Sequence, residues 1–250
     1  MLRLEKKYLV PNYLMSNLRE RLMPFVRPDI YAKANGNSRI PEYVVRSIYF
    51  DSRNLDCYIE KKEGVLLRKK FRVRGYGNYS KNSNIAFEIK RKIENRIKKH
   101  RAFVHYDNIS DLLKTGNIEK YVLQDNGYAA SLDDARRFFF HIKKNHFIPT
   151  CLIVYEREAY HGKFDPGVRI TFDKNIRSYN YPEINALYEN VNFTYLFKNH
   201  FILEIKYFDH TMPLWGRSLI QEFKLKNEAL SKYVLGYDAS KYSKRKANLQ

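Results

Sequence analysis

Hydrophobic and polar residues alternate with a period of two in several segments of this chain, and each such segment is predicted to be a β-strand. The clearest segment, 65–74, places basic side chains on one face of the strand and apolar side chains on the other. The basic face is formed by Arg68, Lys70, Arg72 and Arg74, and the apolar face by Val65, Leu67, Phe71 and Val73. This strand presents a row of cations to whatever lies opposite it.

The same alternation recurs along the chain, with carboxylates among the cations. The charged or polar members of these further segments are Arg3, Glu5 and Lys7; Glu88 and Lys90; Tyr155 and Arg157; Arg169 and Asp173; and Glu204 and Lys206. For a single strand, a solvated outer face explains such a pattern equally well. Its repetition favours charged faces that line the inside of a closed barrel.

Between the strands, apolar residues at helical spacing predict surrounding helices. We expect them at 11–24, 56–63, 111–114, 119–124, 131–142, 213–224 and 231–237, the fifth beginning with a capping box at Ser131 to Asp134. The predicted fold class is α+β, a closed antiparallel β-barrel with surrounding helices. Because buried cations need water or an anion to match them, the inside of this barrel would hold an anionic ligand.

Composition narrows the choice of ligand. The chain has 250 residues, 44% of them hydrophobic, with 46 Lys and Arg against 27 Asp and Glu and a formal charge of +19. Such a charge indicates a polyanionic partner: nucleic acid, acidic lipid or condensed phosphate. No linker divides the chain, so we expect one domain over 1–238 and a basic C-terminal tail over 239–250.

The usual catalytic signatures are missing from the sequence. There is no Walker-type phosphate loop, no metalloprotease histidine pair and no zinc spacing, and Cys57 and Cys151 are the only cysteines. Aromatic residues do not interleave with the basic ones, which disfavours specific nucleic-acid binding. The charged first residues and the lack of an apolar run of about 18 residues predict a cytoplasmic location.

Eight short motifs occur in an order that resembles the vacuolar transporter chaperone (VTC) domain, a family of polyphosphate polymerases in the triphosphate tunnel metalloenzyme (CYTH-like) superfamily. They are Glu5-Lys-Lys7-Tyr-Leu-Val, Val45-Arg-Ser-Ile-Tyr-Phe-Asp51, Lys70-Phe-Arg72-Val-Arg74, Phe87-Glu88-Ile-Lys90, Tyr155-Glu-Arg157, Val168-Arg169-Ile-Thr-Phe-Asp173, Leu203-Glu204-Ile-Lys206 and Ser231-Lys232-Tyr. The resemblance runs from about Arg3 to Tyr237.

The resemblance implies an enzyme that transfers the γ-phosphate of ATP to a growing polyphosphate chain inside a basic tunnel, assisted by Mn²⁺ or Mg²⁺. The residues implied to act in catalysis are Arg72, Arg74, Lys90, Arg157, Arg169 and Lys232. Those implied to bind triphosphate or polyphosphate are Lys7, Lys70, Lys99, Arg101, Tyr155, Lys206 and Ser231. Those implied to hold the metal are Glu204, Glu88 and Glu5. In 96–104 basic residues occupy both registers, so Lys98 and His100 compete with Lys99 and Arg101 for the inner face.

Two other functions stay open. Related tunnel enzymes hydrolyse triphosphate or nucleoside triphosphates, with a carboxylate such as Glu5 or Glu88 activating water; the arginine at position 3, where those enzymes have glutamate, favours the polymerase. A basic module that only binds polyphosphate or RNA would need neither Glu204 nor a metal. Since family relatives work beside membrane proteins, a peripheral membrane-protein partner is a further expectation, and through it an association with membranes.

Overall fold

A computed structural model of the chain describes residues 3–31, 40–93, 96–124, 130–208 and 211–247. The chain divides into two compact units. Unit 1 comprises Met1–Val44, Tyr155–Ile176 and Tyr195–Ser231, and unit 2 comprises Val45–Val154, Arg177–Thr194 and Lys232–Gln250. Four described strands contribute residues to both units: β3 (Glu42–Asp51), β8 (Ile148–Gly162), β9 (Arg169–Asn180) and β10 (Thr194–Tyr195).

Unit 1 is a sheet covered on one face by two helices. Its strands follow the order β1-β11-β9-β8, and β2 pairs with β8. The elements that lie wholly in this unit are β1 (Arg3–Pro11), η1 (Asn12–Leu14), α1 (Met15–Leu22), β2 (Val26–Pro28), β11 (His200–Phe208) and α6 (Leu214–Glu222). The β1–β11 and β11–β9 pairs are antiparallel.

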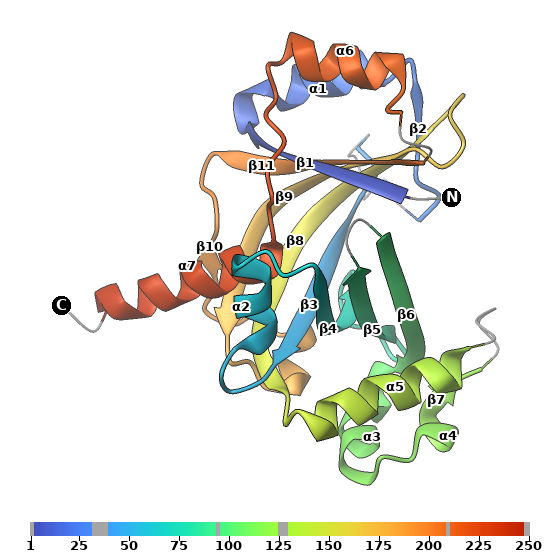
Figure 1. The fold of residues 1–250 in the computed structure, drawn as a ribbon, viewed down its shortest axis with the longest axis vertical. Coiled ribbons are helices and arrows are strands. Elements are labelled where there is room, and N and C mark those ends of the chain that lie inside the picture. Colours follow the sequence, from blue (N-terminus) through green and yellow to red (C-terminus); the bar gives the residue numbers. More distant parts are fainter. Residues whose placement is uncertain (1–2, 32–39, 94–95, 125–129, 209–210, 248–250) are drawn as a thin grey trace. The chain divides into compact units, whose positions relative to one another are not determined.

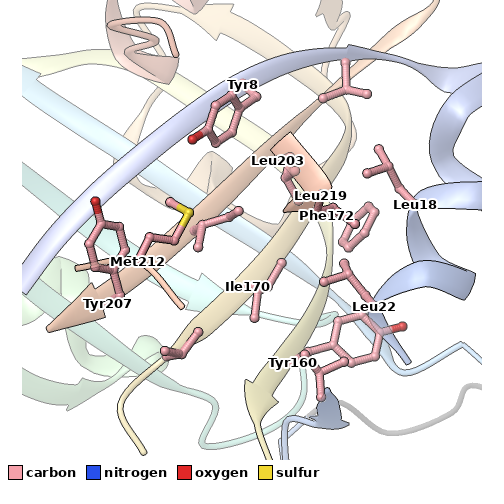
Figure 2. Close-up of a cluster of buried hydrophobic side chains, with 14 of the residues drawn as sticks. Tyr8, Leu18, Leu22, Tyr160, Ile170, Phe172, Leu203, Tyr207, Met212 and Leu219 are labelled. Atoms are coloured by element: carbon pink, nitrogen blue, oxygen red, sulfur yellow. The ribbon is translucent and has the colours of Figure 1, made fainter. Parts of the chain in front are cut away.

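The core of unit 1 gathers the apolar side chains of the alternating strands (Figure 2). Phe172 lies next to Leu18 and Leu22 of α1, and Tyr8 and Leu203 belong to the same cluster; all five are at most 2% exposed. Burial of side chains of this size contributes roughly 1.5–3 kcal/mol each. Because strand side chains alternate, packing this face fixes the charged residues of β1, β9 and β11 on the other one.

In unit 2 the strand order continues as β8-β3-β4-β5-β6-β7, and the pairs from β3 to β7 are antiparallel. The elements that lie wholly in it are α2 (Asp56–Lys62), β4 (Leu67–Tyr76), β5 (Asn84–Ile93), β6 (Arg96–His105), η2 (Tyr106–Asn108), α3 (Ile109–Thr115), α4 (Ile118–Tyr121), β7 (Val122–Leu123), α5 (Ser131–Lys144), η3 (Ile184–Tyr188) and α7 (Lys232–Ala247). Figure 1 shows α5 next to β5 and β6, which it contacts.

Helix α5 covers the apolar face of this sheet. Phe138 packs against Phe50, Phe71 and Phe87 with ring centroids 5.0–6.1 Å apart. The basic face of β4, with Arg72, is thereby left on the opposite side. The predicted division of the strands into a charged and an apolar face is therefore confirmed in each unit.

Other expectations fare differently. The α+β class and the antiparallel pairing are confirmed, but within the described residues the strands of neither unit close into a ring, so the barrel itself is not confirmed. Helix α5 begins where predicted, yet the capping box is wrong: Ala130 is the N-cap, and Ser131 donates from Oγ to the carbonyl of Leu123 (3.2 Å). Helix α7 continues into the predicted tail as far as Ala247.

Candidate active site

The charged face of unit 2 is ordered by the register of three strands. Arg72 pairs with Glu88 and Glu88 with Arg101, so these three residues form one row across the sheet. Lys70, Lys90 and Lys99 form the next row. The open question of 96–104 is thereby answered: Lys99 and Arg101 share the face of Glu88. His100 points to the other face and contacts Asp134 of α5 through Nδ1 (2.6 Å).

Glu88 is the centre of this face. Its Oε2 accepts from Nε (2.6 Å) and contacts Nη2 (2.5 Å) of Arg72. Its Oε1 accepts from Nε of Arg101 (2.8 Å) and lies 2.7 Å from Nζ of Lys99. Burial opposes the charge of this fully buried carboxylate, but Arg72, Arg74, Lys99 and Arg101 together hold the pKa of Glu88 well below its usual range.

The cations around Glu88 outnumber it, and Lys99 shows the consequence. Burial, together with the charges of Arg72 and Arg101, lowers the pKa of Lys99 to about 7 although Glu88 acts in the opposite direction. About a third of this side chain, 36%, remains exposed. Lys99 is therefore poised to take up a proton when an anion arrives.

Polar groups of β3 extend the same face. Nη1 of Arg72 donates to the Tyr49 hydroxyl (3.1 Å) and Nε of the buried Arg74 donates to Ser47 Oγ (3.0 Å). Burial raises the pKa of Tyr49, but Arg72, Arg74 and Lys232 outweigh it, so that the pKa is lowered overall. Lys232, the first residue of α7, is buried, and its effect on the pKa of Tyr49 places it near this cluster.

The charged face of unit 1 is built by β1, β11 and β9. Lys7 pairs with Glu204, and Glu5 with Lys206, which in turn pairs with Arg169. Nζ of Lys7 lies 2.9 Å from Glu5 and 3.4 Å from Glu204, and it donates to the carbonyl of Leu230 (3.0 Å), next to Ser231. The carboxylates Glu5 and Glu204 thus share one ammonium group.

Lys206 contacts Glu204 directly, on the same strand. Burial lowers the pKa of Lys206 to about 8, with Glu204 and Glu5 opposing the shift and Arg157 adding to it. The lysine charge in this unit is therefore also sensitive to what lies nearby.

Arg157 of β8 is held by a carboxylate of the neighbouring strand. Its Nε and Nη2 donate to Asp173 at 2.6 and 2.8 Å, a bidentate pair, and Nη2 lies 3.6 Å from Glu204. Its guanidinium also lies 5.1 Å from the ring centre of Tyr155. Burial opposes the charge, but Asp173 and Glu204 raise the pKa of Arg157 well above its usual value.

Arg169 has a partner that the sequence did not suggest. Its Nη2 donates to the buried Asp29 (2.7 Å) and to the Tyr43 hydroxyl (3.0 Å). Neither residue belongs to an alternating segment, and both are far from Arg169 in the sequence. No periodic signal marks them, whereas Asp173 did stand in an alternating strand and could have been named as the partner of Arg157.

The predicted residues therefore gather in two places. Unit 2 contains Lys70, Arg72, Arg74, Glu88, Lys90, Lys99, Arg101 and Lys232, and unit 1 contains Glu5, Lys7, Tyr155, Arg157, Arg169, Glu204, Lys206 and Ser231. Of the three expected metal ligands, Glu5 and Glu204 meet at Lys7, whereas Glu88 lies among cations. Within the described part of the chain, no three His, Cys, Asp or Glu residues gather as a preformed metal site.

The face of unit 2 gathers several cations around Glu88, whereas the named cations of unit 1 each contact a carboxylate. A surplus of cations is typical of surfaces that bind anions. The VTC domain family model matches residues 2–241, and the chain therefore belongs to the VTC domain family. A search of the curated proteins finds no match to this sequence.

Several solved structures resemble the chain, among them three with low sequence identity. The PH1819 protein from Pyrococcus horikoshii OT3 is 14% identical, with a TM-score of 0.44 over 93% of this chain and 97% of that one. HpAC1 from Hippeastrum, a putative adenylyl cyclase described as having a dominant triphosphatase activity, is 14% identical, with a TM-score of 0.46 over 95% and 96%. The Mediator head module of Schizosaccharomyces pombe is 8% identical, with a TM-score of 0.46 over 90% and 92%.

Proposed function

We propose that this protein is an ATP-dependent polyphosphate polymerase whose charged faces line a closed tunnel. The observation that carries the proposal is the excess of cations around Glu88 in a chain of the VTC domain family. Arginine forks such as those of Arg72 and Arg101 grip two phosphate oxygens at once, whereas Lys70, Lys90 and Lys99 act as mobile point charges. Such a surface suits a linear chain of condensed phosphates.

In the proposed reaction, a terminal oxygen of the polyphosphate chain attacks the γ-phosphorus of ATP. A new P–O bond forms, the bond from the γ-phosphorus to the bridging oxygen breaks, and ADP leaves. The attacking phosphate is already ionised at neutral pH, so no general base is required. The proposed work of Arg72, Arg74, Lys90, Arg157, Arg169 and Lys232 is to align the phosphates and neutralise their oxygens.

Metal binding belongs to the proposal, and the carboxylates differ in how well they fit it. Both Glu88 oxygens already contact arginine or lysine groups at 2.5–2.8 Å, so a metal there would have to displace them. Glu204 contacts Lys206 directly through Oε2, but its Oε1 lies 3.4 Å from Nζ of Lys7. Glu5 contacts the same ammonium (2.9 Å), so two carboxylates share this position. Mg²⁺ and Mn²⁺ commonly use one or two carboxylates with substrate phosphates. We therefore assign the metal to Glu204 and Glu5; when bound, it would neutralise phosphate charge.

Synthesis is favoured over hydrolysis by the state of Glu88. A carboxylate whose pKa is held well below its usual range is a poor acceptor for a proton from water. Glu5, the other candidate base, lies 2.9 Å from Nζ of Lys7. Both carboxylates are better suited to holding cations in place than to activating water.

The test is to incubate the purified protein with ATP and Mn²⁺ and to identify the phosphorus products. The proposal predicts long-chain polyphosphate and ADP. Free phosphate alone would show hydrolysis, and no turnover would indicate a binding module; either result contradicts the proposal. A cytoplasmic location and a peripheral membrane-protein partner remain proposals. Among the described residues, no helix has the length and hydropathy needed to cross a membrane.

A further inference from the structure

Arg46 is a buried arginine of unit 2 that lies on the face of β3 opposite to the charged face with Glu88. It precedes Ser47 on β3 and therefore points away from the charged face. Only 6% of Arg46 is exposed, and its Nε is buried without a hydrogen-bond partner. Nη1 makes one long hydrogen bond, 3.4 Å, to the carbonyl of Glu189. In the described residues, no carboxylate lies within ion-pair distance of this guanidinium.

A second guanidinium lies near the first. Arg177 of β9, in the same unit, is close enough that its charge, after burial, lowers the pKa of Arg46. Arg177 also stands over the ring of Phe193, 5.5 Å from its centre. Two cations placed near each other, one of them buried and unneutralised, repel each other and lose hydration.

Helix η3 covers Arg46 and packs closely against β4 through Tyr188. The Arg46 guanidinium lies 6.0 Å from the centre of the Tyr188 ring. Gly75 pairs with Arg46 across β3 and β4, and a Cβ at Gly75 would lie 2.3 Å from the Tyr188 hydroxyl oxygen, so only glycine admits this ring. Tyr188 packs edge-on against Tyr106 (4.9 Å), whose hydroxyl donates to the carbonyl of Asn185 (2.5 Å).

An unneutralised buried guanidinium costs several kcal/mol, a cost that an incoming anion removes. We propose that Arg46 and Arg177 form a second anion site, which takes a single tetrahedral phosphate group. The planar fork of the Arg46 guanidinium matches phosphate oxygens, and Arg177 adds a second positive charge nearby. The site lies on the opposite face of β3 and β4 from Arg72 and Arg74, so it is separate from the proposed polymerase site.

The phosphate group has two sources, free orthophosphate or the end of a polyphosphate chain. The cover formed by Tyr188 and the small exposed fraction of Arg46 favour orthophosphate. Tripolyphosphate can separate the two sources. It should displace orthophosphate from any site that accepts a phosphate chain, including the charged faces. A site that is closed to chains should keep its orthophosphate when tripolyphosphate is present.

The experiment counts labelled orthophosphate bound per chain by equilibrium dialysis, for wild type, R46M and R91M. Arg91 is exposed on β5 of the same unit, so R91M removes the same charge without touching the site. We expect R46M to bind one phosphate fewer than wild type, and R91M to bind as many. In excess tripolyphosphate, wild type should keep one orthophosphate and R46M none; loss of that phosphate from wild type would assign the site to chain ends.

Equal binding by R46M and wild type would overturn the proposal. A measurement without substitution covers the case in which R46M does not fold: wild-type crystals soaked in tungstate should show tungsten within hydrogen-bond distance of Arg46. Only water at that position would also overturn it. Neither readout depends on polymerase activity. The anion site can therefore be absent in an active polymerase, and it can be present in a protein that does not make polyphosphate.

Discussion

The charged faces of the two units balance their charges differently. In unit 1, the cations Lys7, Arg157, Arg169 and Lys206 meet the carboxylates Glu5, Asp173, Asp29 and Glu204. In unit 2, Arg72, Lys99 and Arg101 all contact the carboxylate of Glu88. The pKa of Arg157 is raised by its partners, whereas that of Lys99 is lowered by burial and by its cationic neighbours.

This difference suggests a division of labour. A face that contains as many carboxylates as cations can supply ligands to a metal. A face with more cations than carboxylates has unneutralised positive charge, which a bound anion would neutralise. We therefore expect unit 2 to gain more from bound polyphosphate, and unit 1 to determine the response to the metal. The predictions below test this contrast.

The largest effect is expected for Glu88→Gln. Arg72, Lys99 and Arg101 would lose their common partner, which should lower the free energy of unfolding by about 3–5 kcal/mol. Tripolyphosphate should then stabilise the variant more than it stabilises wild type, since it replaces the missing charge. Urea denaturation with and without tripolyphosphate measures both effects.

The matched control is Glu158→Gln. Glu158 is equally buried and binds Arg19 through a bidentate pair (2.7 and 2.9 Å) on the other face of β8. This variant should also unfold more easily, but tripolyphosphate should not rescue it selectively. Equal rescue of both variants would show that unit 2 has no particular need of an anion.

Glu204→Gln should lower the rate of synthesis roughly 100-fold, the size expected when one electrostatic contact to a transition state is lost. The Mn²⁺ concentration for half-maximal activity should rise. Activity measured across a Mn²⁺ titration tests this, with Glu156→Gln as control, because Glu156 alternates with Tyr155 and Arg157 and so faces the other way. If the Mn²⁺ dependence of E204Q equals that of wild type, the assignment of Glu204 as a metal ligand is wrong.

The affinity for tripolyphosphate should fall as pH rises above about 7. A phosphate chain favours the charged form of Lys99, whose pKa is about 7, so at higher pH binding must first return a proton to the amine. Between pH 7 and 8.5 we expect a weakening of roughly threefold to tenfold, limited by solvent screening of this partly exposed side chain.

Calorimetry in buffers of different ionisation enthalpy should detect the proton taken up. Lys99→Arg should bind with a smaller pH dependence, because arginine stays charged throughout this range. A variant whose pH dependence equals that of wild type would show that the titrating group lies elsewhere.

The smallest effect is expected for Tyr49→Phe. The change removes the hydroxyl that accepts from Arg72 Nη1 (3.1 Å), and a lost hydrogen bond of this kind is worth about 1 kcal/mol. KM for ATP should therefore rise about fivefold, while Tyr79→Phe, which removes an exposed hydroxyl of the same unit, should leave it unchanged. Steady-state kinetics of the two variants decide the point.

The sequence predicted the facing of the strands well because a buried apolar face enforces a period of two. Residues 67–74 and 85–90 fold as their alternation indicates, with Arg72 and Phe71 on opposite faces. The prediction is wrong at the start of the first segment: Val65 precedes the strand, and Val65 and Leu67 are exposed rather than buried. It could not decide the register of 96–104, where both faces carry basic residues; pairing of Arg101 with Glu88 decides it. The sequence therefore predicted on which face of a strand a site residue lies, but not which residue it contacts.

The partners were harder to predict because ion pairs join residues distant in sequence. Asp29, which holds Arg169, lies just beyond a three-residue strand that no periodicity marks. Arg46 gave no signal either, because its strand has no alternating charged face; its burial beneath Tyr188 of η3 is seen only in the structure. Contacts between residues distant in sequence are thus seen only in the structure, whereas the apolar and charged faces of the strands follow from the sequence.

The most direct test of the central claim compares polyphosphate synthesis by wild type, Arg72→Ala and Arg91→Ala. Both variants lose one arginine from unit 2, but only Arg72 lies on the face of Glu88. The account predicts that R72A loses at least about 100-fold in rate and that R91A makes polyphosphate as wild type does. Full activity in R72A, or equal losses in both variants, would contradict it.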